Sequence, residues 1–437
     1  MLTRSRHITP HPHESPRRLF FRARNNQIMF ADIILLMLLG MVFGTVTGLI
    51  PGIHPNTMFV LMLSALSFFL FGVPAFLIMV FVFSLAVSNT FTDFIPSIIF
   101  GAPDPDAALS VLPGHRMLLL GRGYEALSLT VLGGVGVASL TLLTLPVILY
   151  MVPFIYLSIR PVMHILLVAV VAWMVVGERG RSRLTAFILF LLSGMFGVVS
   201  LNAYPSGSML FPAFTGLFAF STLLVSYWSG GYLPKQEISS DMGGDQRTGV
   251  LAGWLAGWFS GMLPGVGAAQ AGAFAARAVG AKTREFLSAL GGINTSNILF
   301  TFVMFYVLGK TRSGATWAMS QVSGSLGMWE MVVIVLVGFI TCLLSGMATL
   351  GLGRLMLSRL SNIPYRRLTG GVGLFLVIMV ALLSGLPGLL AAFTGTSIGL
   401  LTVLSGVRRS HLMGFLLLPT MLYFSGASPY LMVSLGI

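Results

Sequence analysis

Residues Gly44–Gly52 read G-T-V-T-G-L-I-P-G, and residues Gly257–Gly265 read G-W-F-S-G-M-L-P-G in the same register. Each copy ends a long apolar stretch, where Pro-Gly interrupts a helix that would otherwise cross a membrane. Matched, interrupted apolar segments in two halves of a chain indicate the binding site of a transporter. Glycines at four-residue spacing also allow close helix packing, which is the ordinary alternative for the G-x-x-x-G part alone. Because Pro-Gly recurs in register, we interpret Pro51 and Pro264 as functional helix breaks.

The composition places the chain among integral membrane proteins. Of its 437 residues, 56% are hydrophobic and 8% are charged, and the mean hydropathy is +0.93. Soluble domains carry about 25% charged residues. The apolar runs are long enough for helical spans and lack the dyad alternation of a membrane β-barrel. We therefore predict an all-α polytopic membrane protein with about 10 to 13 transmembrane helices.

The chain divides into a basic tail and two apolar halves joined by a polar segment. We predict a disordered cytoplasmic tail (1–28), a first transmembrane repeat (29–229), a polar linker (230–248) and a second repeat (249–437). Met29 is an alternative start of translation, which would remove the tail.

Further landmarks recur in the same order in both halves and indicate internal duplication. They are Leu191–Gly197 with Leu382–Gly388, Ala213–Gly216 with Ala392–Gly395, and Asn89-Thr90 with Asn294-Thr295. We expect two homologous halves arranged as inverted repeats, because broken helices that face one midplane site suit that symmetry.

The formal charge of +13 is concentrated in short loops between apolar segments. This pattern is typical of cytoplasmic loops, and no basic patch alternates with aromatic residues as in nucleic-acid-binding proteins. We expect a multi-pass protein of the cell (plasma or inner) membrane with a cytoplasmic N-terminus. The basic segments predicted to share the cytoplasmic side are Arg4–Arg24, Arg179–Arg183, Lys282–Arg284, Arg354–Arg367 and Arg408–Arg409.

The residues that follow each Pro-Gly are candidates for binding an anion. A helix that begins at such a break presents unpaired N–H groups and the positive end of its dipole. Two such helix ends, one per half, would bind a ligand with two or more carboxylates. The candidate substrate-binding residues are Gly52, His54, Asn56, Thr57, Gly265, Gly267, Gln270 and Asn294. Asn56 and Thr57 serve equally well as helix N-caps, and His54 alternatively lies at the aqueous interface.

A polar cluster, Ser88–Asp93, ends one apolar span, and Asn294–Asn297 is its expected partner in the second half. Polar side chains are unfavourable in hydrocarbon unless they line a cavity or pair across helices. Amides, hydroxyls and a carboxylate suit a hard cation such as sodium. The candidate coupling-ion residues are Asn89, Thr90, Asp93 and Asn297, and Asp93 is the acid best suited to bind sodium or a proton. A purely structural contact between helices is the alternative.

Enzymatic readings find little support in the sequence. There is no G-x-S-G, no H-E-x-x-H and no P-loop motif, and the single Cys342 rules out a disulfide framework or a cysteine metal site. We predict a non-enzymatic secondary transporter with no metal or cofactor other than a coupling ion. The rivals are a channel and a non-transporting membrane protein, either a scaffold subunit or an enzyme that acts on a lipid-linked substrate.

The chain resembles the large membrane subunit of tripartite tricarboxylate transporters. The paired G-x-x-x-G-x-x-P-G elements, the run Phe211–Phe218 (F-P-A-F-T-G-L-F) and the Asn-rich span after the second Pro-Gly carry this resemblance over nearly all of the chain beyond the tail. Two segments depart from the usual pattern: Gly291–Asn297 lacks an acid, and Ile53-His54-Pro55 replaces a glycine-rich continuation.

The resemblance implies uptake of citrate-like or other carboxylates, driven by a sodium or proton gradient. It also implies a small membrane subunit and an extracytoplasmic solute-binding protein as partners. A homo-oligomer is a further expected assembly.

Overall fold

The computed structural model describes residues 16–50, 73–99, 101, 111–202, 209–229, 234–239, 245–262, 268–280, 282–323, 326–360 and 364–429. All regular elements of these residues are helices. In the described part, seven helices are long and apolar enough to cross a membrane, and two shorter apolar helices, His164–Val176 and Leu210–Val225, accompany them. The predicted class, an all-α polytopic membrane protein, is confirmed.

The described helices lie along the apolar stretches of both predicted repeats. In the first half they are α1 (Pro16–Leu49), α3 (Ala75–Thr92), α4 (Phe94–Ile99), α5 (Val111–Leu119), α6 (Gly123–Ile159), η2 (Arg160–Val162), α7 (Met163–Val176), α8 (Ser182–Asn202), α9 (Leu210–Phe214), the π-helical η3 (Thr215–Phe220) and α10 (Ser221–Ser229). In the second half they are α11 (Arg247–Met262), α12 (Ala268–Ala278), α13 (Thr283–Leu308), α14 (Gly314–Val322), α15 (Met328–Leu360), α16 (Tyr365–Leu404), η4 (Arg409–Met413) and α17 (Gly414–Ser425).

Helices α1 and α3 pack in parallel through the glycines of the first repeated motif. In the second half of α1, a Cβ at Gly40 would lie 3.1 Å from Leu85 N. Two turns later, a Cβ at Gly48 would lie 3.1 Å from Asp93 N. Contacts therefore advance along both helices in the same direction, and larger residues would force the backbones apart.

Helices α11 and α13 pack in the same way in the second half. A Cβ at Gly253 would lie 2.8 Å from Ala289 O, and one at Gly261 would lie 2.5 Å from Phe300 Cβ. This pair is also parallel and also depends on glycine at four-residue spacing.

The two parallel pairs run in opposite directions, because α3 and α13 are antiparallel. The rings of Phe83 and Phe302 lie 4.7 Å apart, and ten residues further along α3 the side chain of Asp93 meets Asn294, earlier in α13. Helices α6 and α15 are antiparallel as well, since a Cβ at Gly346 would lie 3.0 Å from Val131 Cγ1 and Gly353 lies against Leu127.

These directions correct the predicted sidedness of the basic tail. Helix α1 is parallel to α3 and therefore begins at the end of the bundle where α13 finishes. The arginines Arg17–Arg24 lie at the start of α1, whereas Lys282 and Arg284 lie at the start of α13. The tail and the Lys282–Arg284 loop are at opposite ends of the bundle, so the prediction that they share one side is wrong. Counting basic residues in the sequence could not reveal helix direction.

Helix α1 already begins at Pro16, so residues 16–28, predicted to be disordered, are helical. Four of these residues are arginine, which is a good helix former.

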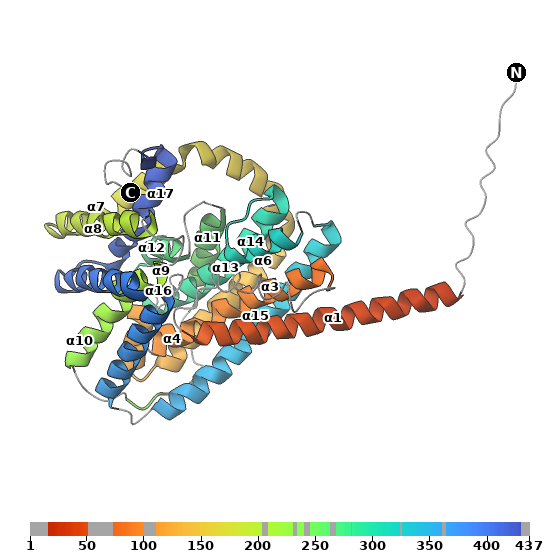
Figure 1. Cartoon of the computed structure of the whole chain (residues 1–437), viewed down its shortest axis with the longest axis horizontal. Helices are drawn as coiled ribbons and strands as arrows, with labels where there is room; N and C mark the ends of the chain where they lie inside the picture. Colours follow the sequence, from red (N-terminus) through yellow and green to blue (C-terminus); the bar gives the residue numbers. More distant parts are fainter. Residues whose placement is uncertain are drawn as a thin grey trace, which may run out of the picture.

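The helices gather in two bundles (Figure 1). The core bundle contains α1, α3–α6 and α11–α15, and the flanking bundle contains α7–α10, α16 and α17. Each bundle takes helices from both predicted repeats. Aromatic rings bridge the bundles, since Phe274 of α12 lies 5.4 Å from Phe259 of α11 and 6.3 Å from Trp173 of α7.

The landmark Leu382–Gly388 and its counterpart Leu191–Gly197 have different backbone conformations in the flanking bundle. Gly385 in Leu382–Gly388 has φ 60° and ψ −155°, and it divides α16 just before Pro387. The counterpart Leu191–Gly197 lies within the continuous α8. Only glycine accepts this φ readily, and α8 has no proline at the corresponding place.

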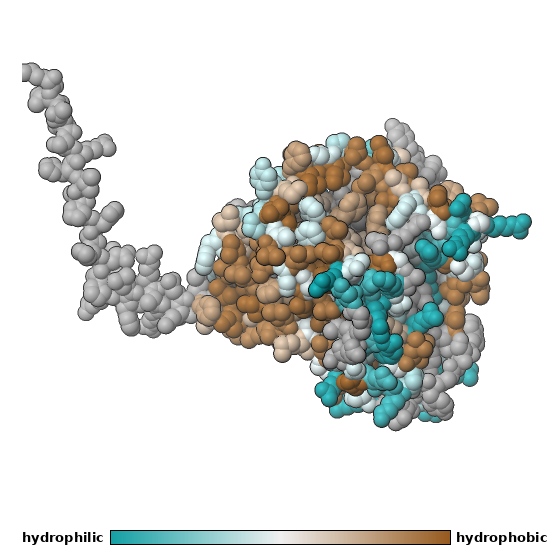
Figure 2. Space-filling model, turned by 180° about the vertical axis from the view of Figure 1, so that it is seen from behind, coloured by the Kyte–Doolittle hydropathy of each residue, from teal (hydrophilic) through white to brown (hydrophobic). Residues whose placement is uncertain are grey.

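Large apolar side chains cover much of the surface. Leu143, Tyr150 and Phe154 of α6 are among many that are exposed, and Figure 2 shows a broad apolar area beside a hydrophilic patch on one face. An apolar surface of this extent is unfavourable in water and suits contact with lipid.

The helix directions predict opposite accessibility for Lys310, just after α13, and Arg359, at the end of α15. Both side chains are exposed, and the native Cys342 is buried, so Lys310→Cys and Arg359→Cys each supply one accessible thiol. We expect a membrane-impermeant maleimide to label one of the two variants in intact cells and the other only after permeabilisation. Labelling of both from one side would contradict the antiparallel arrangement.

Candidate functional site

Asp93 and Asn294 form the centre of a buried polar site between α3 and α13. Asn294 Nδ2 donates to Asp93 Oδ2 at 2.7 Å and to Thr90 O at 3.3 Å. Both side chains are almost fully buried, with 4% exposure for Asp93 and 3% for Asn294. The contact joins residues about 200 positions apart, so the fold brings the two predicted polar clusters together as expected.

Hydroxyl groups extend this site along α3. Thr90 Oγ1 lies 3.5 Å from Thr295 Oγ1, and Thr90 also donates to Val87 O at 2.8 Å. Asp93 caps the end of α3, where its backbone N–H donates to Asn89 O and its carbonyl accepts from Ser97 Oγ at 2.9 Å. The carboxylate is therefore held on a well-connected helix end.

Asn89 and Asn297 make equivalent contacts in the two parallel helix pairs. Asn89 Nδ2 donates to Thr47 Oγ1 at 3.2 Å, and Ser260 Oγ donates to Asn297 Oδ1 at 3.2 Å. Thr47 and Ser260 occupy the same place in the repeated motif, immediately before its second glycine.

The structural counterpart of Asn89 is thus Asn297. The sequence pairing of Asn89-Thr90 with Asn294-Thr295 is shifted by three residues, about one helical turn. The identical Asn-Thr dipeptides suggested that pairing. The register of α3 relative to α13 is instead defined by the contacts of Asn89 with α1 and of Asn297 with α11. In this register Asn294 corresponds to Ala86, so the first half has no amide at that place.

The site lies near mid-depth of the core bundle. Asn294 is close to the middle of the 26-residue α13. Helix α1 ends one residue after Gly48, beside Asp93, and α11 ends one residue after Gly261, beside Phe300. Phe300 is about 9 Å along α13 from Asn294. Two glycine-lined helices that run in opposite directions therefore end close to the same polar pair.

Several predicted site residues cannot be placed. Pro51, Gly52, His54, Asn56, Thr57, Pro264, Gly265 and Gly267 lie outside the described residues, and Gln270 lies in α12 with its side chain outside them. Their roles as helix breaks or substrate ligands stay predictions. In the sequence, each Pro-Gly follows within two residues of the end of α1 or α11.

The chemistry available at the site is that of a cation or proton site. A buried carboxylate is unfavourable unless it is paired, hydrogen-bonded or protonated. Carboxylate, amide and hydroxyl oxygens from Asp93, Thr90 and Asn89 are hard ligands of the kind that sodium accepts. Among the described residues, no three His, Cys, Asp or Glu side chains gather in a way that would hold a transition metal.

Sequence reasoning missed the hydroxyls of Thr47 and Ser260. A signal was present, because the repeated motif reads T-G in one copy and S-G in the other at this place. Both hydroxyls also donate to the motif's first glycine carbonyl, at 3.1 Å in α1 and 3.0 Å in α11.

Sequence reasoning also missed Arg312, which follows α13 at the far end of the core bundle. Its guanidinium lies over the ring of Tyr156, 5.1 Å from the centroid. The buried Nε and Nη1 atoms have no hydrogen-bond partner among the described residues, and burial lowers the pKa of Arg312 below its usual range. A half-buried cation of this kind attracts anions.

Comparisons with known proteins identify a family and a relative of this chain. The model of the family described as "Tripartite tricarboxylate transporter TctA family" matches residues 34–414. A protein of Methanocaldococcus jannaschii, "Uncharacterized protein MJ1079", is 27% identical over 405 residues, which cover 90% of this chain and 98% of the relative. No solved structure matches the chain significantly.

The hydrogen bond between Asp93 and Asn294 predicts an energetic coupling. Asp93→Ala and Asn294→Ala should each lower stability by about 1–3 kcal/mol, because each leaves a buried polar partner without its bond. The double variant should lose less than the sum, by about 1 kcal/mol, as measured by thermal unfolding in detergent. Asp93→Ala combined with the distant Thr402→Val serves as the additive control. Full additivity for both pairs would argue against the bond.

Proposed function

Because the chain belongs to the tripartite tricarboxylate transporter TctA family, we propose that it is a secondary active permease for small carboxylate-type anions, coupled to a sodium or proton gradient. Membership of the family makes it a transporter component and not an enzyme. The carboxylate substrate, the sodium or proton coupling and the transport mechanism are proposed here.

One observation carries this function: a buried carboxylate–amide pair where two oppositely directed, glycine-lined helices end. Interrupted helices that end near the bilayer midplane are the usual frame of a transporter site. A scaffold subunit would not need a buried carboxylate there, because an ionisable side chain is costly to bury within a membrane bundle and usually has a functional role.

We assign the coupling cation or proton to Asp93, with Asn89, Thr90 and Asn297 as neighbouring ligands. The substrate carboxylates would meet the backbone after Pro51-Gly52 and Pro264-Gly265, with Asn294 between the two. An anion and a cation bound a few ångströms apart stabilise each other, which would make their affinities interdependent and their transport coupled.

The helix directions support an inverted repeat. Helices α1 and α3 would correspond to α11 and α13, and α6 to α15, since each pair of counterparts runs in opposite directions. Their matching contacts include Asn89 with Thr47 and Asn297 with Ser260.

For alternating access we propose that the core bundle moves against the flanking bundle. Phe259, Phe274 and Trp173 line the described contact between them. An apolar aromatic contact has few directional bonds to break, so it permits displacement of one bundle past the other.

One end of the core bundle would face the cytoplasm because basic residues gather there, as is typical of cytoplasmic loops. These residues are Lys282, Arg284, Arg354 and Arg359. The start of α1 would then face outwards. The proposed partners, a small membrane subunit and an extracytoplasmic solute-binding protein, are the other components of a tripartite system.

Ligand-dependent thermal stability tests this function without a transport assay. We expect a di- or tricarboxylate to raise the unfolding midpoint of the detergent-purified protein, and sodium to enlarge the shift, because ligands that bind the native state stabilise it by mass action. Asp93→Asn should retain the fold and abolish the sodium-dependent part. The exposed Glu237→Gln removes the same charge and should respond like the wild type.

Equal sodium responses of Asp93→Asn and the wild type would return Asp93 to a structural role. Protonation of Asp93 as the coupling step would instead show as a carboxylate shift that depends on pH and ignores sodium.

The helix break is tested by Pro51→Ala combined with Gly52→Ala. This double variant should insert normally and lose uptake of labelled carboxylate into proteoliposomes by at least about tenfold, because a continuous helix removes the proposed N–H groups. Pro146→Ala, which changes an exposed proline within α6, is the matched control. Uptake at the wild-type rate in the double variant would remove Pro51-Gly52 from the mechanism.

A further inference from the structure

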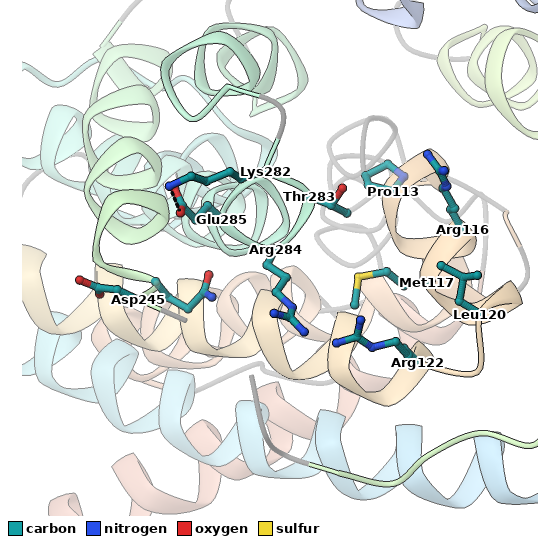
Figure 3. Close-up of a pocket in the computed structure, with 11 residues that line it drawn as sticks. Pro113, Arg116, Met117, Leu120, Arg122, Asp245, Lys282, Thr283, Arg284 and Glu285 are labelled. Atoms are coloured by element: carbon teal, nitrogen blue, oxygen red, sulfur yellow. Dashed lines mark hydrogen bonds and ion pairs between the residues drawn. The ribbon is translucent and has the colours of Figure 1, made fainter. Parts of the chain in front are cut away.

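A basic cavity of about 510 Å³ lies at one end of the core bundle, away from the Asp93–Asn294 pair (Figure 3). It is formed by the end of α5, the turn before α6, the residues before α11 and the start of α13. The residues that line it are Pro113, Arg116, Met117, Leu120, Arg122, Asp245, Gln246, Lys282, Thr283, Arg284 and Glu285. Asn294 is nine residues beyond this lining along α13, about 14 Å away.

The basic cavity has an excess of positive charge. Lys282 Nζ is paired with Glu285 Oε1 at 2.7 Å, and Asp245 forms an ion pair with Arg247 outside the cavity, with Arg247 Nε 3.8 Å from Asp245 Oδ1. Arg122 and Arg284 share one buried carboxylate, Glu125, with Arg284 Nε 2.7 Å from Glu125 Oε1.

Arg116 adds a further cation to this set. It is exposed and has no carboxylate partner among the described residues. Of the four basic side chains that line the cavity, Arg116 is the one that makes no ion pair with a described acid.

The backbone of α13 strengthens this preference for an anion. Lys282 is the N-cap of α13 and its side chain makes no capping bond, so the first N–H groups of the helix are not satisfied by a cap. Thr283 adds a hydroxyl at the same place (Figure 3). Helix N-termini beside arginine and lysine are frequent phosphate sites.

The rim of the basic cavity is apolar on the side of α5. Leu119 and Leu120 are exposed, at 40% and 65%, next to the exposed Arg116. Cationic and apolar groups lie side by side in this way where a membrane protein meets a phospholipid headgroup and the first part of its acyl chains.

We propose that the basic cavity binds the phosphate group of an anionic phospholipid at the membrane surface. Arg116, Arg122 and Arg284 would donate to the phosphate oxygens, together with the first N–H groups of α13. Leu119 and Leu120 would contact the acyl chains. The bound lipid would link α5 and α6 to α13, and so stabilise the core bundle at its basic end.

The test compares three purified proteins: the wild type, Arg116→Gln and Arg359→Gln. Arg116 makes no ion pair with the described residues, so its loss should leave the fold intact. Arg359 is an exposed arginine at the same end of the bundle and outside the cavity, which makes Arg359→Gln the charge-matched control. After delipidation in detergent, the unfolding midpoint of each is measured against dioleoyl-phosphatidylglycerol, dioleoyl-phosphatidylcholine and inorganic phosphate.

We expect phosphatidylglycerol, and not phosphatidylcholine, to raise the midpoint of the wild type and of Arg359→Gln. The apparent affinity of Arg116→Gln for phosphatidylglycerol should be about tenfold weaker, as for the loss of one charge-assisted contact. Native mass spectrometry should then find fewer co-purified anionic lipids on Arg116→Gln.

Equal responses to phosphatidylglycerol in Arg116→Gln and the wild type would overturn the proposal, as would an equal effect of phosphatidylcholine. A shift with inorganic phosphate alone, lost in Arg116→Gln, would overturn the lipid as ligand and assign the cavity to a soluble phosphate. Lipid binding by the basic cavity does not require transport. If the wild type binds phosphatidylglycerol but transports no carboxylate, only the proposed function is refuted.

Discussion

The close approach of helix backbones at glycine is the constraint on which the rest of this structure depends. Between α6 and α13, Gly133 lies against the carbonyl of Ser288 and Gly291 lies against that of Thr130, which leaves no room for a Cβ. Apolar burial does not drive helices together within lipid, so small residues and the dispersion contacts they permit must do so. Because α3, α6, α11 and α13 are held this closely, Asp93 and Asn294 can meet at 2.7 Å in the interior.

Because the interior is packed so closely, the buried pair of Asp93 and Asn294 points to a function and not to packing alone. Thr90 bonds to Thr295 and to the carbonyl of Val87, and Asn89 donates to the hydroxyl of Thr47, as buried polar groups in a membrane must find partners. A carboxylate in such a place is expensive to keep for packing alone. Its position beside the ends of two oppositely directed helices is the reason that we propose a transport site there and not an ordinary interhelical contact.

The sequence predicted features that lie within one helix. It did not predict relations between helices, such as register and direction. Hydropathy predicted an all-α polytopic membrane protein, and the polar clusters around Asp93 and Asn294 do converge. The match of Asn89 with Asn294 failed because identical dipeptides are easily shifted by a turn, whereas the glycine contacts pair Asn89 with Asn297. The common side for the tail and Lys282 failed because charge counts carry no information on helix direction.

The sequence by itself determined that this is a helical membrane protein with a repeated, glycine-rich and Pro-Gly-terminated motif, because hydropathy, glycine spacing and proline act locally along the chain. Only the tertiary structure decided that the two motifs run in opposite directions, that Thr47 and Ser260 bind Asn89 and Asn297, and that Arg116 and Arg284 line one cavity. Those relations depend on which helix faces meet across long separations in the chain. Packing geometry selects those faces, and no single stretch of residues encodes them.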